Sequence, residues 1–485
     1  MAIDRKKIGY IILIVILVFA IFLRVYSLSH QSLWVDEAIS ASASKIILEK
    51  GTPVFDSGAF YGRAYVFHYA QAFFLLFGEN DFNVRILSVI LGLLTVVLAY
   101  FVGKEYSKSG GVICALFMSV FYLEVFFSRQ ARFYQLFQLA FFACLYFLYK
   151  SNHSKEKSKK TEVVYLILSL VAFFIALDSQ IAALVLAPFL IGYILIYNKP
   201  KYLAIIPVIP LVWKLIAVLG LSSQSTESVI NYATGYLNYV SNLYYLLIFF
   251  IPGVIWSFLK KKTFTLLIIL PSLVLLAGVF LVQTFALRYG YFFVFPLVVY
   301  SSLLLCYLYE KYDKIFLIAI IGVLLIPSNI FFPYTFVNVI KPIDYNHAAM
   351  DYSSPETNYK IIPMNVLNEL KNKNNTLISF FSADVEWYIR KPDLVIPFSM
   401  DGRGEDEISY NSTDINNVTK IVDIYSGAPI INYSQTSKIK RPYYVTADSF
   451  SYFKLKPGQL ASFSNLTANC SLAYSADDLK VFECR

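Results

Sequence analysis

Long apolar runs, separated by short polar loops, dominate the chain as far as residue 332. A helix needs about 20 apolar residues to cross a bilayer, where it must pair all of its own backbone groups. The later residues form only short apolar stretches broken by Pro, Gly and Asn, which predict strands of a compact domain. We therefore expect a transmembrane module over 1–332 and a mixed α/β domain over 333–485. The pattern predicts eleven spans, at 8–28, 84–103, 112–127, 136–149, 162–177, 181–197, 202–220, 239–258, 263–283, 291–308 and 315–332.

The segment 64–77, AYVFHYAQAFFLLF, is apolar and strongly aromatic but short for a span. Its placement decides the side of every later loop. If it does not cross, the basic short loops, including 150–160 and Lys260 to Lys262, all fall on one side, as cytoplasmic loops do. We therefore predict an amphipathic helix at the outer surface of the cell membrane, a cytoplasmic amino terminus and a C-terminal domain outside.

The composition agrees with an α-helical polytopic membrane protein. Of the 485 residues, 58% are hydrophobic and 15% are charged, and the mean hydropathy is +0.59, well outside the range of soluble domains. A net charge of +9 would suggest nucleic acid as the partner of a soluble protein. Here most Lys and Arg residues cluster between apolar runs, where they orient helices, so no nucleic-acid partner is expected.

The tail has features of an oxidising outer compartment. Cys470 and Cys484 lie close enough in sequence to close a hairpin, and we predict a disulfide between them. The other cysteines lie within apolar runs, and no cysteine or histidine pattern predicts a metal site. Glycosylation is predicted at six Asn-x-Ser/Thr sequons of the tail, at Asn374, Asn411, Asn417, Asn432, Asn465 and Asn469.

The predicted orientation gathers a small set of polar residues on the outer side. Asp36 and Glu37 form an acidic pair in the first outer loop. An aspartate there can act as a general base on an acceptor hydroxyl, while arginines can bind a phosphate leaving group through paired hydrogen bonds. Glycosyl transfer from a lipid-linked phosphosugar requires both. The other members of this set are Trp34, Arg63, Arg129, Arg132, Tyr134, Arg288 and Tyr289.

Each of these residues also has a purely structural interpretation. Acidic pairs at the start of a helix often cap it, because negative side chains suit the positive end of the helix dipole. Arginines at span ends anchor lipid headgroups, and Trp34 suits the aromatic belt of a membrane protein. Glu124 lies inside the apolar run 112–127, where a carboxylate is costly, and is therefore a functional candidate.

Three stretches of the first 150 residues follow one another in an informative order: SLWVDEAISASA, the aromatic AYVFHYAQAFFLLFG, and SRQARFYQLF. Together they resemble the GT-C membrane glycosyltransferases, which include the protein O-mannosyltransferases, the lipid A aminoarabinose transferases and the Rgt-like group. The remaining spans resemble this family in layout and in the Arg288-Tyr289 pair before a late span. The resemblance implies a helical membrane fold with interfacial helices in the first outer loop.

The resemblance also implies roles for single residues. Asp36 would be the catalytic base, and Glu37 would support it. Arg132, in the Arg-x-Tyr pattern with Tyr134, would bind the donor phosphate, as would Arg288. One departure is Gln135, which stands where several relatives have an acid. We therefore expect metal-independent transfer and no cofactor.

These observations predict an inverting glycosyltransferase of the EC 2.4 class. It would move a hexose such as mannose from a polyprenyl or dolichyl phosphate to a protein, lipid or glycan acceptor on the outer face. A transporter or lipid flippase is an alternative, although no pair of broken helices occurs in corresponding halves. A scaffold that presents the glycosylated tail is another. The sequence leaves the sugar and the acceptor open.

Overall fold

The structure, a computed structural model, divides the chain into two compact units. The first comprises Met1–Ser27, Arg63–Phe67 and Arg85–Ile343, and the second comprises Leu28–Gly62, His68–Val84 and Asp344–Arg485. The second unit thus includes most of the loop between residues 28 and 84 in addition to the tail. The predicted boundary at 332 lies outside the described residues. The structure describes residues 5–153, 158–197, 244–282, 287–312, 359–380, 382–396, 409–413, 419–431, 439, 442–448, 457–476 and 479–485.

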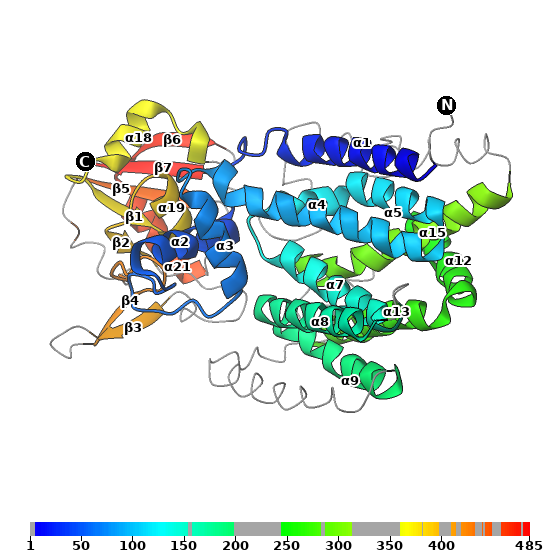
Figure 1. Ribbon diagram of the computed structural model, residues 1–485. Helices are drawn as coiled ribbons and strands as arrows, with labels where there is room; N and C mark the ends of the chain where they lie inside the picture. The colour runs from blue at the N-terminus through cyan, green and yellow to red at the C-terminus, as the bar shows by residue number, and fades with distance from the viewer. Residues whose placement is uncertain are drawn as a thin grey trace. The chain divides into compact units, whose positions relative to one another are not determined.

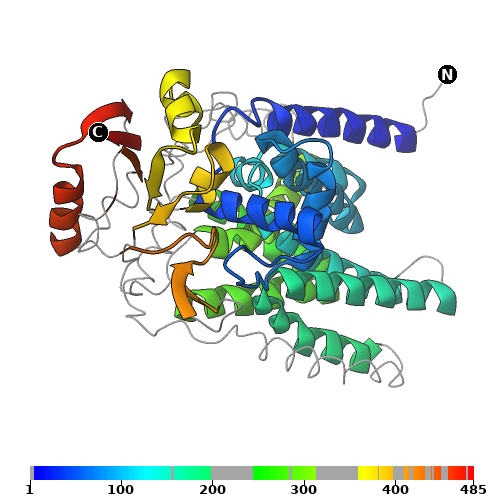
Figure 2. The ribbon, with the colours of Figure 1, turned by 90° about the vertical axis from the view of Figure 1, so that its left-hand side faces the viewer.

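The first unit is a bundle of helices that lie side by side (Figures 1 and 2). α7 packs on α8, and α15 packs on both α5 and α12. Its described helices are α1 (Arg5–Val25), α4 (Asp81–Tyr106, which begins in the second unit), α5 (Lys108–Val120), α6 (Tyr122–Ser128), α7 (Tyr134–His153), α8 (Lys159–Ser179), η1 (Ile181–Val185), α9 (Leu186–Tyr197), α12 (Tyr244–Lys260), α13 (Lys262–Val282), α14 (Leu287–Gly290), η3 (Tyr291–Phe293) and α15 (Val294–Lys311).

Where the chain is described, the predicted spans coincide with helical structure except at residues 26–28, which form a turn after α1, and at Phe121. The spans 202–220 and 315–332 lie outside the described residues. By length and composition, four described helices can cross a membrane: α4, α8, α13 and the continuous helical stretch Arg288–Lys311. The bent pair α5 and α6 makes a fifth if it is counted as one span.

The run 112–127 is not the single continuous span that the sequence predicts. The chain bends by 62° between α5 and α6, with Phe121 in an extended conformation at the break. Such a break leaves carbonyl groups at the end of α5 without partners in the helix. The fully buried Arg24 of α1 donates to two of them, Ser119 O at 2.8 Å and Met118 O at 3.4 Å. A side chain remote in sequence therefore stabilises the break.

The second unit contains a five-stranded mixed sheet with the order β2-β1-β5-β7-β6. β1 pairs in parallel with β2 and β5, and β7 pairs antiparallel with β5 and β6. The strands are β1 (Thr376–Ser379), β2 (Leu394–Val395), β5 (Tyr443–Asp448), β6 (Ser471–Ala476) and β7 (Leu479–Cys484), and β3 (Ser409–Thr413) and β4 (Thr419–Asp423) form a separate hairpin. The helices are α2 (Val35–Lys50), α3 (Tyr65–Leu75, which begins in the first unit), η4 (Tyr359–Ile361), α18 (Met364–Lys371), α19 (Ser382–Tyr388) and α21 (Pro457–Thr467).

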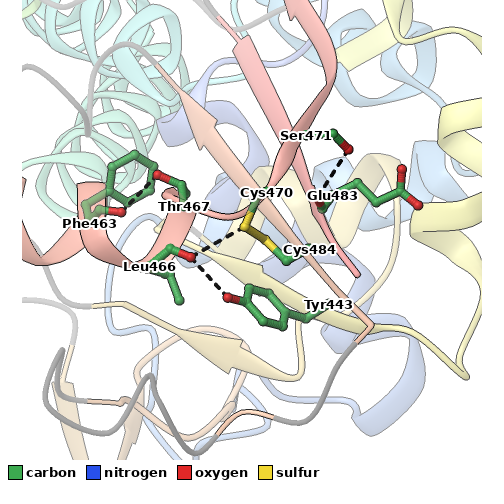
Figure 3. The surroundings of a disulfide bond; sticks show 8 residues. All are labelled: Tyr443, Phe463, Leu466, Thr467, Cys470, Ser471, Glu483 and Cys484. Carbon is green, nitrogen blue, oxygen red and sulfur yellow. Dashed lines mark hydrogen bonds between the residues drawn. A yellow bond between two sulfur atoms is a disulfide. The ribbon is translucent and has the colours of Figure 1, made fainter.

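Side chains from both faces of this sheet are buried, as the alternation of a strand requires. Leu377 and Val481 share a core with residues of α18 and α19, whereas Phe463 of α21 contacts the rings of Phe380 and Phe482. Figure 3 shows the disulfide between Cys470 and Cys484, which joins the turn between α21 and β6 to β7. Beside it, the Tyr443 hydroxyl donates to Leu466 O at 3.0 Å. The tail therefore folds as a mixed α/β domain.

The segment 64–77 forms α3, a helix of 11 residues, which at about 1.5 Å per residue is too short to cross a bilayer. Its two faces differ. Val66, Tyr69 and Phe73 are exposed, while Phe67 and Gln71 are buried. An exposed face of large apolar side chains suits a helix in the plane of the membrane interface.

Candidate functional site

Asp36 and Glu37 lie in the first turn of α2 and have different environments. The side chain of Glu37 is fully buried, and its Oε2 accepts the backbone N–H of Trp34 at 3.3 Å. This bond caps the helix at the position that Glu prefers for the purpose. Asp36 is half-buried, and its backbone carbonyl accepts the Ser40 hydroxyl at 3.0 Å. The sequence allowed a capping role for Asp36 and Glu37, and in the structure Glu37 is the residue that caps α2.

The C-terminal domain holds both ends of the loop that carries α2. The hydroxyl of Tyr388, in α19, accepts the N–H of Leu33 at 2.5 Å and donates to Asp81 Oδ2 at 2.7 Å. Trp387 Nε1 donates to the other oxygen of Asp81 at 3.1 Å, and Lys360 forms an ion pair with Asp81 at 2.5 Å. Lys360 also donates to the carbonyl of Ser29. Asp81 is only 4% exposed, and burying a carboxylate is costly unless it is paired. These contacts offset that cost.

A second set of contacts joins the middle of the loop to the same domain. Asp56 forms ion pairs with Lys50 of α2 and with Lys391, at 2.9 and 3.1 Å. Partial burial alone would raise the pKa of Asp56, but the hydrogen bonds from both lysines lower it below its usual value. Gly427 approaches so closely that a Cβ there would lie 2.9 Å from the backbone nitrogen of Ser57. Its φ of 67° also favours glycine.

α19 packs against α2. It carries two further acidic side chains, Asp384 and Glu386, whose pKa values are raised. Burial raises the pKa of Asp384 to about 7, and the nearby charge of Asp448 adds to the effect despite a hydrogen bond from Tyr359. Burial likewise raises the pKa of Glu386 to about 7. The sequence did not single out these residues, and only the tertiary fold reveals their burial.

In the first unit, the side chain of Arg129 has a structural role at the end of α1. Its guanidinium donates to four carbonyl groups at the end of α1, those of Leu23, Arg24, Tyr26 and Ser27, at 2.6–3.3 Å. These are acceptors that a helix end leaves without partners. α4 passes close to this region, since a Cβ at Gly92 would lie 2.4 Å from Ser128 Cβ. Arg129 is therefore committed to the packing of α1 against α6.

The other predicted arginines occupy different environments. Arg132 is 5% exposed, with its guanidinium over the rings of Phe133 and Tyr134 at 4.7 and 5.5 Å from their centroids. Arg288 is half-buried and lies over the ring of its neighbour Tyr289 at 5.4 Å. Stacking on an aromatic ring keeps the planar guanidinium oriented. Arg63, by contrast, is exposed.

Glu124 is fully buried in α6. Its Oε1 accepts Gln138 Nε2 at 2.7 Å, and its Oε2 lies 2.8 Å from the hydroxyl of Tyr291. Tyr291 comes shortly after Arg288 and was not singled out from the sequence, because a tyrosine at the start of an apolar span has the ordinary appearance of an aromatic-belt residue.

The predicted glycosylation sites can be placed in part. Asn374, Asn411, Asn465 and Asn469 are exposed, as an acceptor for glycosylation must be. Asn417 and Asn432 lie outside the described residues. Within the described ranges, no three His, Cys, Asp or Glu side chains are grouped so that they could hold a metal ion. Metal-independent transfer stays a prediction.

Comparison with known proteins connects this arrangement to a family. Residues 63–224 match the family described as dolichyl-phosphate-mannose-protein mannosyltransferase. The match begins at Arg63 and includes Glu124, Arg129, Arg132 and Tyr134. No curated protein sequence matches the chain.

Solved structures share the fold over almost the whole chain. The chain is similar to ArnT from Cupriavidus metallidurans in the apo state, with 11% identity and a TM-score of 0.66 over 99% of this chain and 98% of that one. The same protein bound to undecaprenyl phosphate gives 12% identity and a TM-score of 0.61 over the same shares. The oligosaccharyltransferase AglB from Archaeoglobus fulgidus, in complex with an inhibitory peptide and a dolichol-phosphate, gives 12% identity and a TM-score of 0.55 over 92% of this chain and 70% of that one.

At these identities the structural matches show the fold, and they confirm the predicted helical membrane architecture with a mixed α/β domain at its C-terminal end. The family that residues 63–224 match is described as a transferase with a lipid-linked donor. Residues 63–224 are thus similar to the dolichyl-phosphate-mannose-protein mannosyltransferase family, and the fold of the chain is similar to those of ArnT and AglB.

Proposed function

We propose that the protein transfers a single hexose from a polyprenyl phosphate to a hydroxyl group of an acceptor, and that the hexose is mannose. The acceptor oxygen attacks the anomeric carbon of the sugar while the bond from that carbon to the phosphate oxygen breaks. The acceptor proton goes to a base, and the polyprenyl phosphate leaves with the bonding electron pair. The configuration at the anomeric carbon is inverted.

In this proposal Asp36 is the base. The observation that supports this assignment is that the two residues of the acidic pair differ in burial and in hydrogen bonding. Glu37 is buried and caps α2, whereas the half-buried Asp36 is not needed for the cap. The loop is also anchored at Leu33, three residues before Asp36, by Tyr388. A general base has to be held in a defined position, and such anchoring supplies that condition.

Arg132 and Arg288 are the proposed partners of the donor phosphate, with Tyr134 and Tyr289 stacked beside them. Guanidinium groups suit this role because they bind phosphate oxygens in pairs and remain charged. Arg129 is excluded from it in this proposal, since its guanidinium serves the end of α1. The ligands of the solved relatives, undecaprenyl phosphate and a dolichol-phosphate, support a polyprenyl phosphate as the donor.

The proposed location is the cell membrane, with a cytoplasmic amino terminus and an external C-terminal domain. The disulfide of Cys470 and Cys484 and the exposed sequon asparagines support an external domain. Transfer is proposed to need no metal or other cofactor, because the arginines can take the role of a cation at the leaving phosphate. The acceptor, whether protein, lipid or glycan, is to be found by experiment.

The test is to incubate the purified protein in detergent with dolichyl-phosphate mannose labelled in the sugar, and in parallel with the undecaprenyl carrier. The proposal expects label to leave the lipid and to appear on an acceptor or, slowly, on water. A transporter or flippase would leave the labelled lipid intact and move it between the leaflets of a proteoliposome. Intact lipid after prolonged incubation with every acceptor class would overturn the proposal.

A further inference from the structure

A buried polar cluster lies where α4, α6, α7 and η3 meet, inside the first unit. Its members are at most 1% exposed: Thr95, Glu124, Gln135, Gln138 and Tyr291. Burial of so many polar groups in a membrane bundle is costly unless each finds a partner. The hydrogen bonds within the cluster therefore determine which protons the cluster contains.

The contacts of Gln135 fix the direction of the first bonds. The hydroxyl of Thr95 donates to Leu91 O at 3.0 Å, so its oxygen can only accept from Gln135 Nε2, at 2.8 Å. The amide oxygen of Gln135 then faces Tyr291, and the two oxygens are 2.6 Å apart. The phenol oxygen also lies 3.2 Å from the amide oxygen of Gln138. Since an amide oxygen only accepts, the single phenol proton of Tyr291 goes to the shortest of these contacts, the one with Gln135.

The bond between Tyr291 and Glu124 consequently needs a proton of its own. Glu124 Oε2 lies 2.8 Å from the phenol oxygen, whose proton is already used. Glu124 Oε1 accepts from Gln138. Only a protonated carboxyl group can supply the missing donor. The buried Arg24 does not alter this count, because its guanidinium donates to backbone carbonyls of α1 and α5.

The cluster also joins the two segments that bear the proposed phosphate ligands. Gln135 lies three residues after Arg132, in the first turn of α7. Tyr291 lies three residues after Arg288, at the start of the helical stretch that becomes α15. Phe127 of α6 stacks on the Tyr291 ring with centroids 4.1 Å apart. A loss of these bonds would therefore loosen both segments at their entry into the bundle.

We propose that Glu124 is a neutral carboxylic acid and that its bond to Tyr291 is a positioning element, which fixes the starts of α7 and α15 so that Arg132 and Arg288 are held for the donor phosphate. The role of the two arginines rests on the proposed function. The neutral state of Glu124 rests on the hydrogen-bond count alone. Glu124 itself does not contact the substrate in this account.

The first test compares Glu124→Gln with Glu124→Leu. A glutamine can accept from Gln138 and donate to Tyr291, so E124Q should keep the donor KM within about twofold of wild type, whereas E124L should raise it by about tenfold. The acceptor KM should be unchanged in both. Equal damage in the two variants would show that Glu124 acts as a charge, and an unaltered donor KM in E124L would remove its positioning role.

Tyr291→Phe provides a second variant in case E124L does not fold, because the ring and its stacking on Phe127 are retained. It should raise the donor KM as E124L does. The matched control is Tyr300→Phe, which removes another fully buried phenol from the same stretch, hydrogen-bonded to Tyr106 at 3.2 Å and outside the cluster. An equal effect of Y291F and Y300F on donor KM would contradict the proposal.

Infrared spectroscopy tests the protonation state without any assay of transfer. Wild-type protein should show the carbonyl stretch of a buried protonated carboxyl group, which E124Q should lack. The absence of that difference overturns the neutral state. If wild-type protein releases no sugar at all, the proposed function fails instead. The positioning role is then read from the affinity for undecaprenyl phosphate, which E124L should weaken and E124Q should keep, and equal affinities in both variants would refute it.

Discussion

Tyr388 donates its hydroxyl to the carboxylate of Asp81 at 2.7 Å while accepting the backbone N–H of Leu33 at 2.5 Å. One side chain of the tail thus joins the beginning of α4 to the residue that precedes α2 by two positions. Asp36 follows Leu33 closely in the chain. The position of the proposed base therefore depends on a domain more than 300 residues later in the sequence.

Replacing Tyr388 with Phe should lower the rate of transfer several-fold. The variant loses the phenol bonds and leaves a buried carboxylate with fewer partners, at a cost of about 1–3 kcal/mol. The measurement is kcat together with the melting temperature. Tyr444→Phe is the control, because it removes a phenol bond to Glu483 in the same domain without touching the loop. Equal kcat for both variants would separate Tyr388 from the positioning of Asp36.

Arg129 and Arg132 should respond differently to replacement by Ala. Arg129→Ala should destabilise the protein by about 3 kcal/mol or more, because several buried carbonyl groups lose a charged donor. Arg132→Ala should instead raise the donor KM by about tenfold with little change in melting temperature. Thermal unfolding and donor titration of the two variants check this. A large loss of stability in R132A with normal donor KM would reverse the assignment.

Arg288→Ala should behave as Arg132→Ala does and weaken the donor more than the acceptor. Its matched control is the exposed Arg63, whose replacement by Ala should leave the donor KM unchanged. Titration of each substrate in detergent gives both constants. A greater effect of R288A on the acceptor would remove Arg288 from the phosphate site.

The stability of the second unit should fall as the pH rises. The pKa of Asp384 is raised from 3.8 to about 7 in the folded protein, so between these values the folded state holds a proton that the unfolded state has released. Stability is therefore greatest at low pH in this window and declines up to about pH 7. Asp384→Asn should make the loss of stability with rising pH less steep. The remaining loss should come from Glu386, whose pKa is also raised. Thermal unfolding from pH 5 to 8 tests this, with the exposed Glu369→Gln as control, and an equal slope in D384N would contradict it.

The local pattern of apolar and polar residues predicted much of this fold. The features that it did not predict depend on contacts between residues far apart in the chain. The apolar runs gave the helices, and the stretches TLIS and YYVTAD form β1 and β5. The break at Phe121 was not predictable, because the run is apolar throughout and the break depends on Arg24, 95 residues before Ser119. The contact of Tyr388 with Asp81 has no local signal either.

The candidate site was predictable to a similar extent. The acidic pair and the arginines stood out because charges flank apolar runs. The division of roles within them did not, since the sequence cannot tell that Glu37 caps α2 or that Arg129 serves the end of α1. Glu124 was singled out by its cost in an apolar run. Its partners Gln138 and Tyr291 became visible only in the folded protein.

Asp36 is the residue proposed to remove the proton from the acceptor hydroxyl. The most direct measurement is single-turnover transfer of labelled mannose by Asp36→Asn, compared with Glu49→Gln, which removes an exposed carboxylate from the same helix α2. We expect D36N to lose transfer by a factor of about 100 or more, with donor affinity and melting temperature close to wild type, and E49Q to be normal. Transfer by folded D36N at the rate of E49Q would show that Asp36 is not the base.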